Sequence, residues 1–130
     1  MSNLTEECLF CNKKKQNIIY STKFIYVVRD SFPVTKYHSL IIPHRHISNF
    51  FDLNNDELKD LSKILKKERQ SLLNLDKEIT AFNVGVNAGE DSGQSIMHCH
   101  IHLIPRRKGD IKNPRGGVRG VIPSKQKYIR

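Results

Sequence analysis

Residues 96–105 read I-M-H-C-H-I-H-L-I-P. This apolar run follows a loop-like G-E-D-S-G-Q at 89–94 and ends at a proline, which is the pattern of a β-strand. Side chains alternate between the two faces of a strand, so His98, His100 and His102 are predicted to share one face. The opposite face is predicted to join the hydrophobic core, and it carries Cys99, Ile101 and Leu103.

The histidine face is unusual for a strand that is simply half exposed to solvent. Threonine, lysine or glutamate would fill such a face more often, and the whole chain holds only six histidines. A half-buried strand that carries histidines by chance is the alternative. Three aligned histidines favour a functional site.

A row of three strand histidines is too long for all three rings to bind one metal ion. A strand rises roughly 3.3 Å per residue, so the Cα atoms of His98 and His102 lie about 13 Å apart. Zinc, by contrast, binds its ligand atoms at roughly 2.0–2.3 Å. Imidazole also serves as a nucleophile, a general acid or base and a hydrogen-bond donor near neutral pH. The row therefore indicates a substrate with several anionic oxygens in line, such as a phosphoanhydride.

The composition predicts one domain in a reducing compartment. A chain of 130 residues with 38% hydrophobic residues supports a modest core, and no apolar run is long enough to span a membrane. The N-terminus M-S-N-L-T-E-E-C has no basic stretch followed by an apolar one, so no secretory signal is predicted. Three cysteines are an odd number, which does not suit a disulfide framework and favours the cytoplasm.

The positive charge is concentrated at the C-terminal end. Residues 106–130 hold nine lysines and arginines against one aspartate, whereas residues 1–105 carry a net charge of only +1. The basic tail can attract phosphates or simply stay solvated, and both interpretations are open. The near-neutral remainder argues against nucleic acid as the partner.

The remaining pattern predicts four more strands and one long helix. Residues 18–29 are β-prone with a turn near 21–23, which predicts two strands, and 38–43 and 79–87 predict two more. The strand at 79–87 is expected to pair antiparallel with the histidine strand that follows it. Asn54 can cap a helix in which Glu57 completes a capping box, and leucines at helical spacing continue it to about Leu75. The Gly- and Pro-rich tail is expected to be irregular.

The motif H-C-H-I-H-L-I resembles the H-x-H-x-H-x-x signature of the histidine triad (HIT) family of nucleotide hydrolases and transferases. D-S-F-P-V-T-K-Y-H-S-L-I-I-P-H-R-H-I-S-N-F-F-D-L at 30–53 and N-V-G-V-N-A-G-E-D-S-G-Q-S at 83–95 resemble the same family, so the resemblance runs from about Cys8 to Pro123. It implies an α+β, HIT-like fold: an antiparallel sheet of about five strands, one long helix and a short N-terminal helix. It also implies a single domain, with a HIT core over 1–105 and a basic tail over 106–130, that assembles as a homodimer.

The resemblance further implies roles for the residues that match the family pattern. His100 would attack the α-phosphate of a dinucleoside polyphosphate or nucleoside phosphoramidate and carry a transient nucleotidyl group. The carbonyl of His98 would hold its other ring nitrogen, and His102 would help the leaving group depart. No catalytic metal is required, because histidines and backbone amides can stabilise phosphoryl oxygens. The nucleotide-binding residues implied are Asn87 and Ser95 for phosphate oxygens, Gly93 and Gln94 for the wall around them, Asp30 for the ribose hydroxyls and His38 behind the triad.

One residue departs from the family pattern. Tyr37 stands before His38, at a position where many members have glycine. The departure concerns the local turn rather than the chemistry.

The pair C-L-F-C at 8–11 is half of a zinc site by its spacing. Cys99 is predicted to face the core, so any further ligands should be histidines. The resemblance to some HIT branches, and to the related galactose-1-phosphate uridylyltransferases, implies one structural zinc bound by Cys8, Cys11, His46 and His98. His44 competes with His46, because residues two apart share a strand face. A C-x-x-C that binds nothing is the alternative to zinc.

Two other functions compete with the nucleotide hydrolase or nucleotidyl transferase. A zinc metalloenzyme of another class would use two triad histidines and an open coordination position, but no acidic residue stands beside the triad to act as a base, since Glu90 and Asp91 lie in the loop. A non-catalytic nucleotide or nucleic-acid binding module would use the basic tail, but it leaves the ordered histidines without a purpose. The nucleotide enzyme is therefore the leading hypothesis, with a nucleotide substrate and no membrane partner.

Overall fold

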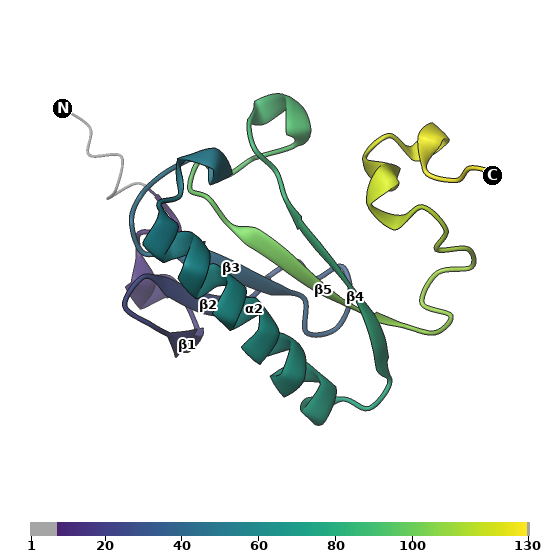
Figure 1. Ribbon diagram of the computed structural model, residues 1–130, viewed down its shortest axis with the longest axis horizontal. Helices are drawn as coiled ribbons and strands as arrows, with labels where there is room; N and C mark the ends of the chain where they lie inside the picture. Colours follow the sequence, from purple (N-terminus) through teal and green to yellow (C-terminus); the bar gives the residue numbers. More distant parts are fainter. Residues whose placement is uncertain (1–7, 130) are drawn as a thin grey trace.

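The computed structural model describes residues 8–129 and has an α+β fold (Figure 1). Five antiparallel strands form one sheet in the order β1-β2-β3-β5-β4. The strands are β1 (Ile18–Ser21), β2 (Ile25–Arg29), β3 (Ser39–Pro43), β4 (Ile79–Val86) and β5 (Ile101–Arg107). One long helix, α2 (Asn55–Leu75), packs on one face of the sheet. The predicted fold class is confirmed, as is the antiparallel pairing of the strand at 79–87 with the histidine strand.

Helix α2 begins where the capping pattern places it. The Asn54 side chain accepts a hydrogen bond from the Glu57 amide, and the Glu57 carboxylate accepts one from the Asn54 amide, both at 2.9 Å. This is the predicted capping box, which satisfies two amides that the first turn leaves without helical partners. The carboxylate of Glu57 is also buried against Arg45, so the helix start is tied to the loop after β3.

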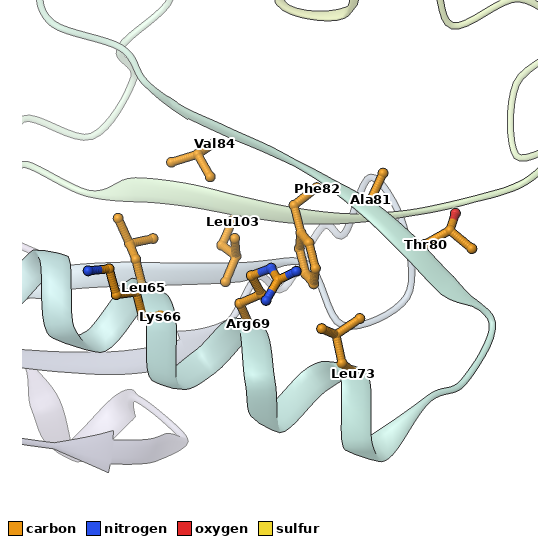
Figure 2. A pocket seen from close by; sticks show the side chains of 9 residues that line it. All are labelled: Leu65, Lys66, Arg69, Leu73, Thr80, Ala81, Phe82, Val84 and Leu103. Atoms are coloured by element: carbon orange, nitrogen blue, oxygen red, sulfur yellow. The ribbon is translucent and has the colours of Figure 1, made fainter.

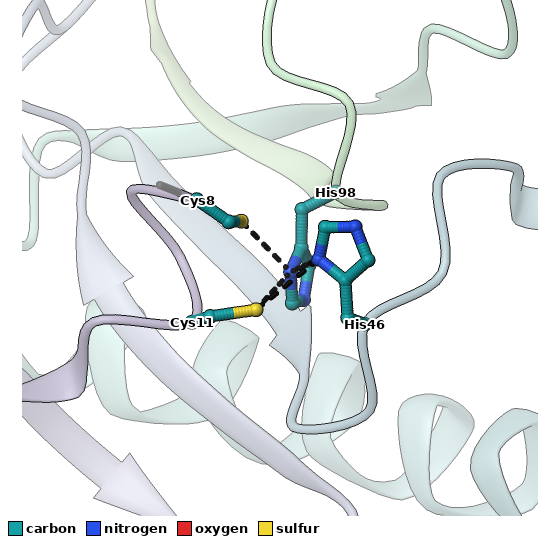
Figure 3. Close-up of side chains that lie close together, drawn as sticks. All are labelled: Cys8, Cys11, His46 and His98. Atoms are coloured by element: carbon teal, nitrogen blue, oxygen red, sulfur yellow. Dashed lines mark hydrogen bonds between the residues drawn. The ribbon is translucent and has the colours of Figure 1, made fainter. Parts of the chain in front are cut away.

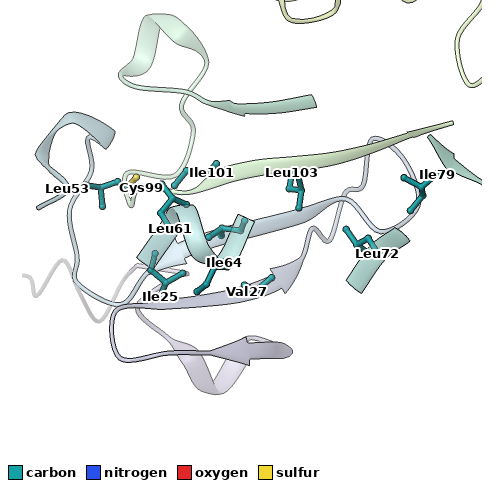
Figure 4. Packing of buried hydrophobic residues seen from close by; sticks show 11 residues of the cluster. Ile25, Val27, Leu53, Leu61, Ile64, Leu72, Ile79, Cys99, Ile101 and Leu103 are labelled. Atoms are coloured by element: carbon teal, nitrogen blue, oxygen red, sulfur yellow. The ribbon is translucent and has the colours of Figure 1, made fainter. Parts of the chain in front are cut away.

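The main hydrophobic core lies between α2 and the sheet (Figure 4). From the triad segment it contains Cys99, Ile101 and Leu103, all nearly fully buried. The predicted alternation is therefore confirmed, because the residues between the histidines face the helix. The histidines themselves face the other side of the sheet.

A second, smaller core covers that other face. It consists of Phe10, Tyr26, Val28, Leu40 and Ile42. Phe10 comes from the N-terminal segment, and its carbonyl accepts a hydrogen bond from the Tyr26 hydroxyl. This contact holds the C-L-F-C segment against the sheet on the histidine side.

The histidine strand begins later than predicted. Strand β5 starts at Ile101, so His98 and His100 precede it and only His102 lies within it. Both neighbouring strands first pair with β5 at Ile101. Before that point the segment bonds to a loop instead, and the Cys99 amide donates to the Ile47 carbonyl at 2.7 Å.

The same strand also continues past Pro105, where the sequence suggested an end. The carbonyl of Pro105 accepts a hydrogen bond from the Thr35 hydroxyl at 2.6 Å, beyond the last residue of β3 that pairs with β5. The nitrogen and carbonyl of one strand residue point to the same side. The missing N–H of Pro105 therefore faces a loop, and no ladder bond is lost.

The other elements are short 3₁₀ helices: η1 (Lys13–Lys15), η2 (Phe50–Asp52), η3 (Glu90–Ser92), η4 (Gly117–Val121) and η5 (Pro123–Lys125). Within the described residues, the short helix expected near the N-terminus is the single turn η1. The predicted absence of a secretory signal rests largely on residues 1–7, which lie outside the described residues. The tail expected to be irregular contains η4 and η5. Among residues 8–129, no helix is long and apolar enough to cross a membrane.

An apolar groove of about 410 Å³ lies between α2 and β4 on the helix side of the sheet (Figure 2). Its floor includes Phe82, Val84 and Leu103, and its helix wall includes Leu65 and Leu73. Val84 is 47% exposed there. Strand β4 is an edge of the sheet, so within residues 8–129 no strand pairs with its outer side.

Candidate functional site

The ring of His100 is held in one orientation by the backbone of its own segment. Its Nδ1 lies 2.8 Å from the carbonyl oxygen of His98, which can only accept a hydrogen bond. Nδ1 therefore carries a proton, and in the neutral ring Nε2 keeps its lone pair. The side chain is buried, and the Phe10 ring packs edge-on against it with centroids 5.0 Å apart. His100 thus presents a fixed, unprotonated nitrogen of the kind that a nucleophile needs.

A second chain of hydrogen bonds sets the tautomer of His102. The Val34 amide donates to Nδ1 of His38 at 3.0 Å, so the proton of neutral His38 sits on Nε2. That Nε2 lies 2.9 Å from Nδ1 of His102 and donates to it. The remaining proton of His102 is therefore on its own Nε2. His102 presents an N–H donor beside His100, with ring centroids 5.2 Å apart.

Asp30 lies beside the same ring nitrogen of His38 that contacts His102. Its Oδ2 lies 3.4 Å from Nε2 of His38, and its Oδ1 accepts from the Phe32 amide at 2.9 Å. The ligand-type atoms of Asp30, His38 and His102 also lie within 4.8 Å of one another, a spacing that a metal ion could bridge. The hydrogen bonds already account for their contact.

Burial keeps these histidines neutral. It lowers the pKa of His102 to about 4, and the neighbouring His100 and His38 add to the shift. Burial also lowers the pKa of His38, although Asp30 opposes the change. Both rings therefore act as hydrogen-bonding groups rather than as cations near neutral pH.

The first triad histidine belongs to a different cluster (Figure 3). Nδ1 of His98 lies 3.3 Å from Sγ of Cys8, 3.4 Å from Sγ of Cys11 and 3.2 Å from Nδ1 of His46. Cys11 Sγ lies 3.1 Å from the same His46 nitrogen. Ligand atoms around a tetrahedral zinc ion stand about 3.3–3.5 Å apart for these pairs. The four side chains therefore have the spacing and chemistry of a Cys₂His₂ metal site.

The chemistry of the donor atoms also suits a cation. Nε2 of His98 donates to the Pro43 carbonyl at 2.8 Å, which directs the lone pair of Nδ1 into the cluster. Burial lowers the pKa of His98 to about 4, so the ring is neutral, as a metal ligand must be. Burial, with the adjacent Cys8, raises the pKa of Cys11 to about 11, and a bound cation would reverse that shift.

The three side chains of the H-R-H segment at 44–46, after β3, lie in three different environments. Arg45 bonds Glu57 at 2.8 Å and so anchors the segment to the start of α2. His46 enters the cysteine cluster. His44, the competing residue in the sequence, lies instead against the Tyr26 ring, with Nε2 at 3.0 Å from the Thr22 carbonyl. The segment is not a strand here, so residues two apart need not share a face.

The loop before the triad is held by Gln94. Its buried amide accepts from the Gly89 N–H at 2.9 Å and donates to the Ser48 carbonyl at 2.7 Å. Gly93 has a φ of 101°, a conformation that a side chain would strain. Ser95 is exposed at the end of this loop, and Asn87 stands at its start, where β4 ends.

Tyr37 adopts a left-handed backbone conformation of the kind that glycine adopts without strain. Its φ is 73°, in the left-handed region that non-glycine residues avoid. The ring is partly buried against the main core, and this packing offsets the strain.

Two features of the site are not predicted from the sequence. Phe10 contacts both His98 and His100, yet it reads only as a spacer residue between two cysteines. A cleft of about 730 Å³ opens beside His102 between the sheet and the C-terminal segment. The glycines at 116–120 were the one hint that the chain makes a close approach there.

The HIT domain family model matches residues 12–109, and the chain belongs to this family. It is 34% identical over 94 residues to the bis(5'-nucleosyl)-tetraphosphatase (asymmetrical) of Schizosaccharomyces pombe, covering 72% of this chain and 51% of that protein. It is 31% identical over 110 residues to the adenosine 5'-monophosphoramidase of Saccharomyces cerevisiae, covering 82% and 66%. The chain thus spans less than two thirds of the length of either relative.

A solved structure has the same fold. The zinc-bound histidine triad family protein of Mycobacterium smegmatis superimposes with a TM-score of 0.74 at 24% identity, covering 82% of this chain and 79% of that one. The likeness to this structure concerns the fold alone. The names of the two enzymes state that one acts on bis(5'-nucleosyl) tetraphosphates and the other on adenosine 5'-monophosphoramidate.

The neutral state of His102 is open to direct measurement. We expect its ring to stay neutral from pH 7 to pH 5 and to protonate near pH 4, because burial opposes the charge. An exposed histidine in the unfolded chain has a pKa of about 6.5. The unfolded chain therefore binds more protons between these values, and this ring lowers the free energy of unfolding as pH falls from about 6.5 toward 4. Histidine ¹⁵N NMR across this range measures the titration, and protonation of His102 near pH 6.5 would contradict it.

Proposed function

We propose that the protein is a nucleotide hydrolase or nucleotidyl transferase that cleaves at the α-phosphate of a dinucleoside polyphosphate or nucleoside phosphoramidate. His100 forms a covalent nucleotidyl intermediate. The observation that carries this proposal is the 2.8 Å contact between Nδ1 of His100 and the His98 carbonyl, which leaves Nε2 free to attack. The activities named for the two relatives support the same substrate classes.

The reaction has two displacement steps. Nε2 of His100 attacks the α-phosphorus, a P–N bond forms, and the bond to the leaving group breaks with its electron pair. A leaving phosphate departs as an anion, whereas the leaving nitrogen of a phosphoramidate takes one proton from solvent and departs as ammonia. Water then attacks the phosphorus and the P–N bond breaks. Its electron pair returns to Nε2, and one proton of water passes to solvent. In a transferase, another nucleophile takes the place of water.

The neighbouring groups supply hydrogen bonds rather than protons. Nε2–H of His102 is directed at the phosphoryl or leaving-group oxygens, because His38 occupies the other ring nitrogen. Asn87 and Ser95 bind phosphate oxygens from the loop that Gly93 and Gln94 shape. Asp30 accepts hydrogen bonds from the two ribose hydroxyls.

Replacing the nucleophile separates chemistry from binding. We expect His100→Ala to lower kcat/KM for diadenosine tetraphosphate and adenosine phosphoramidate by at least about 1,000-fold, since no other nitrogen can form the intermediate. AMP should still bind within about threefold of the wild-type Kd. Intact-protein mass spectrometry after mild acid quenching should find an adenylyl adduct on the wild type alone.

The control for this experiment is His44→Ala, which removes a histidine outside both clusters. It should keep both turnover and the adduct. Turnover retained by His100→Ala would refute the nucleophile assignment, and no adduct or AMP from the wild type with any nucleotide would refute the proposed reaction.

We also propose that Cys8, Cys11, His46 and His98 bind one structural zinc ion. The distances between their donor atoms and the orientation of His98 support this site. Four protein ligands fill a tetrahedral zinc site and leave no open position for catalysis, which disfavours a zinc metalloenzyme. Free cysteines persist most readily in a reducing compartment, which supports a cytoplasmic location.

Metal analysis tests the zinc site. Protein purified without chelator should contain one zinc ion per chain, and Cys11→Ala should contain none. His44→Ala, the matched histidine variant, should keep its zinc. Removal of zinc by a strong chelator should lower the Tm, because the binding free energy contributes to folding. The absence of stoichiometric zinc from the wild type would overturn the assignment.

We further propose a homodimer that joins two sheets at β4. The exposed edge strand and the adjoining apolar groove of α2 would both be covered by a second copy. This arrangement agrees with the dimer that the family resemblance implies.

A charge placed in this groove tests the dimer. Val84→Lys should shift the mass measured by light scattering from that of two chains to that of one, because the lysine would be buried in a groove that Lys66 and Arg69 also line (Figure 2). Ile19→Lys, at an exposed position of the opposite edge strand, should leave the mass unchanged. A wild type with the mass of one chain would exclude the dimer.

A further inference from the structure

The C-terminal segment and the histidine face of the sheet enclose a cleft of about 730 Å³. His38, His102 and Asn87 line it on the sheet side, and Gly117, Val118 and Val121 line it on the opposite side. Ligand sites of small molecules commonly have this size. The cleft therefore joins the triad to a part of the chain that the proposed chemistry does not use.

The C-terminal wall is a built structure rather than a loose tail. A side chain at Gly116 would lie 1.8 Å from the Gln126 carbonyl oxygen, so the two turns of the wall meet backbone to backbone. Gln126 also donates to the Arg115 carbonyl at 3.3 Å and accepts from Arg119 at the same distance. A Cβ at Gly117 would lie 3.2 Å from the Asn83 side chain, which brings the wall onto β4.

The position of the cleft suits the departing half of a substrate. His102 lines it but His100 does not, and the two rings are neighbours. A substrate with its phosphorus at Nε2 of His100 can therefore extend past His102 into the cleft. Asn87 and His102 both line the cleft, so the phosphate oxygens of the leaving group would lie beside them.

The lining indicates what kind of group the cleft accepts. Its arginine, Arg106, is already occupied: it bonds both oxygens of Asp110 at 2.8 Å and the Asn83 amide oxygen at 2.7 Å. The walls are otherwise largely apolar, with Val34, Ile104, Ile111 and Val118 among them. An uncharged ring system fits these walls better than a bare phosphate, which would lack a free cation.

We propose that this cleft binds the leaving nucleoside of a dinucleoside polyphosphate, and that the C-terminal segment thereby selects substrates with a large leaving group. This inference rests on the proposed function, since it assumes cleavage by His100. It predicts a preference for diadenosine tetraphosphate over adenosine phosphoramidate, whose leaving group is only ammonia.

Two variants of the wall test the inference on the full chain. Val118→Trp fills the cleft, and it should lower kcat/KM for diadenosine tetraphosphate at least about tenfold. The same variant should change kcat/KM for adenosine phosphoramidate less than about twofold. The matched control is Ile122→Trp, at a residue of similar exposure in the same segment that does not line the cleft. It should affect neither substrate.

Val118→Ala guards against a folding effect of the large residue. It should lower kcat/KM for diadenosine tetraphosphate about threefold, mainly by raising KM, and leave kcat/KM for adenosine phosphoramidate unchanged. Equal changes for both substrates, or no change with either variant, would overturn the cleft assignment.

The wild-type enzyme separates the two proposals. Turnover of the phosphoramidate without turnover of the tetraphosphate would refute the cleft assignment alone. No turnover of either would refute the proposed function, and the inference would fall with it.

Discussion

The three polar groups of His98 connect the parts of the site. Its Nε2 bonds the end of β3 at Pro43, its Nδ1 meets the cysteine cluster, and its carbonyl orients His100. Because one residue makes all three contacts, the N-terminal segment, the sheet and the reactive imidazole share one frame. A shift of His98 would misdirect Nε2 of His100, because the carbonyl that orients the His100 ring would move with it. Burial adds to this constraint. The His98 ring is shielded from water, so its nitrogens cannot exchange their protein partners for water molecules.

Much of the fold could be predicted because local signals agreed with the tertiary structure. The capping box at Asn54 and the leucine spacing placed α2 almost to the residue. The alternation around Cys99 correctly predicted which face meets the helix, although the strand itself starts only at Ile101. That boundary depends on where β3 and β4 stop pairing, which is a property of neighbours in space. The strand end predicted at Pro105 was wrong for the same reason. A proline ends a strand only where a neighbouring strand would need its N–H for a ladder hydrogen bond.

The site was less accessible to sequence reasoning. The spacing of the histidines and cysteines indicated which chemistry to expect. The structure brings Cys8, Cys11, His46 and His98 together, as the family resemblance implied. Residue types alone gave no tautomers. The tautomers depend on contacts with two backbone groups, the Val34 amide and the His98 carbonyl. Every residue has such groups, so the sequence does not indicate which of them a histidine will contact. The role of Phe10 and the cleft beside His102 likewise depend on packing between segments that lie far apart in the chain.

The contact between Gly116 and Gln126 has a consequence for the history of the chain. No residue with a Cβ fits at position 116 while the Gln126 backbone keeps its place, so neither turn can change its path alone. A descendant that loses the glycine must rebuild both turns together or give up the wall. The C-terminal segment should therefore be inherited as a unit or replaced as a unit. The glycine, which contributes no side chain to the wall, becomes the residue by which such a unit can be traced in distant relatives.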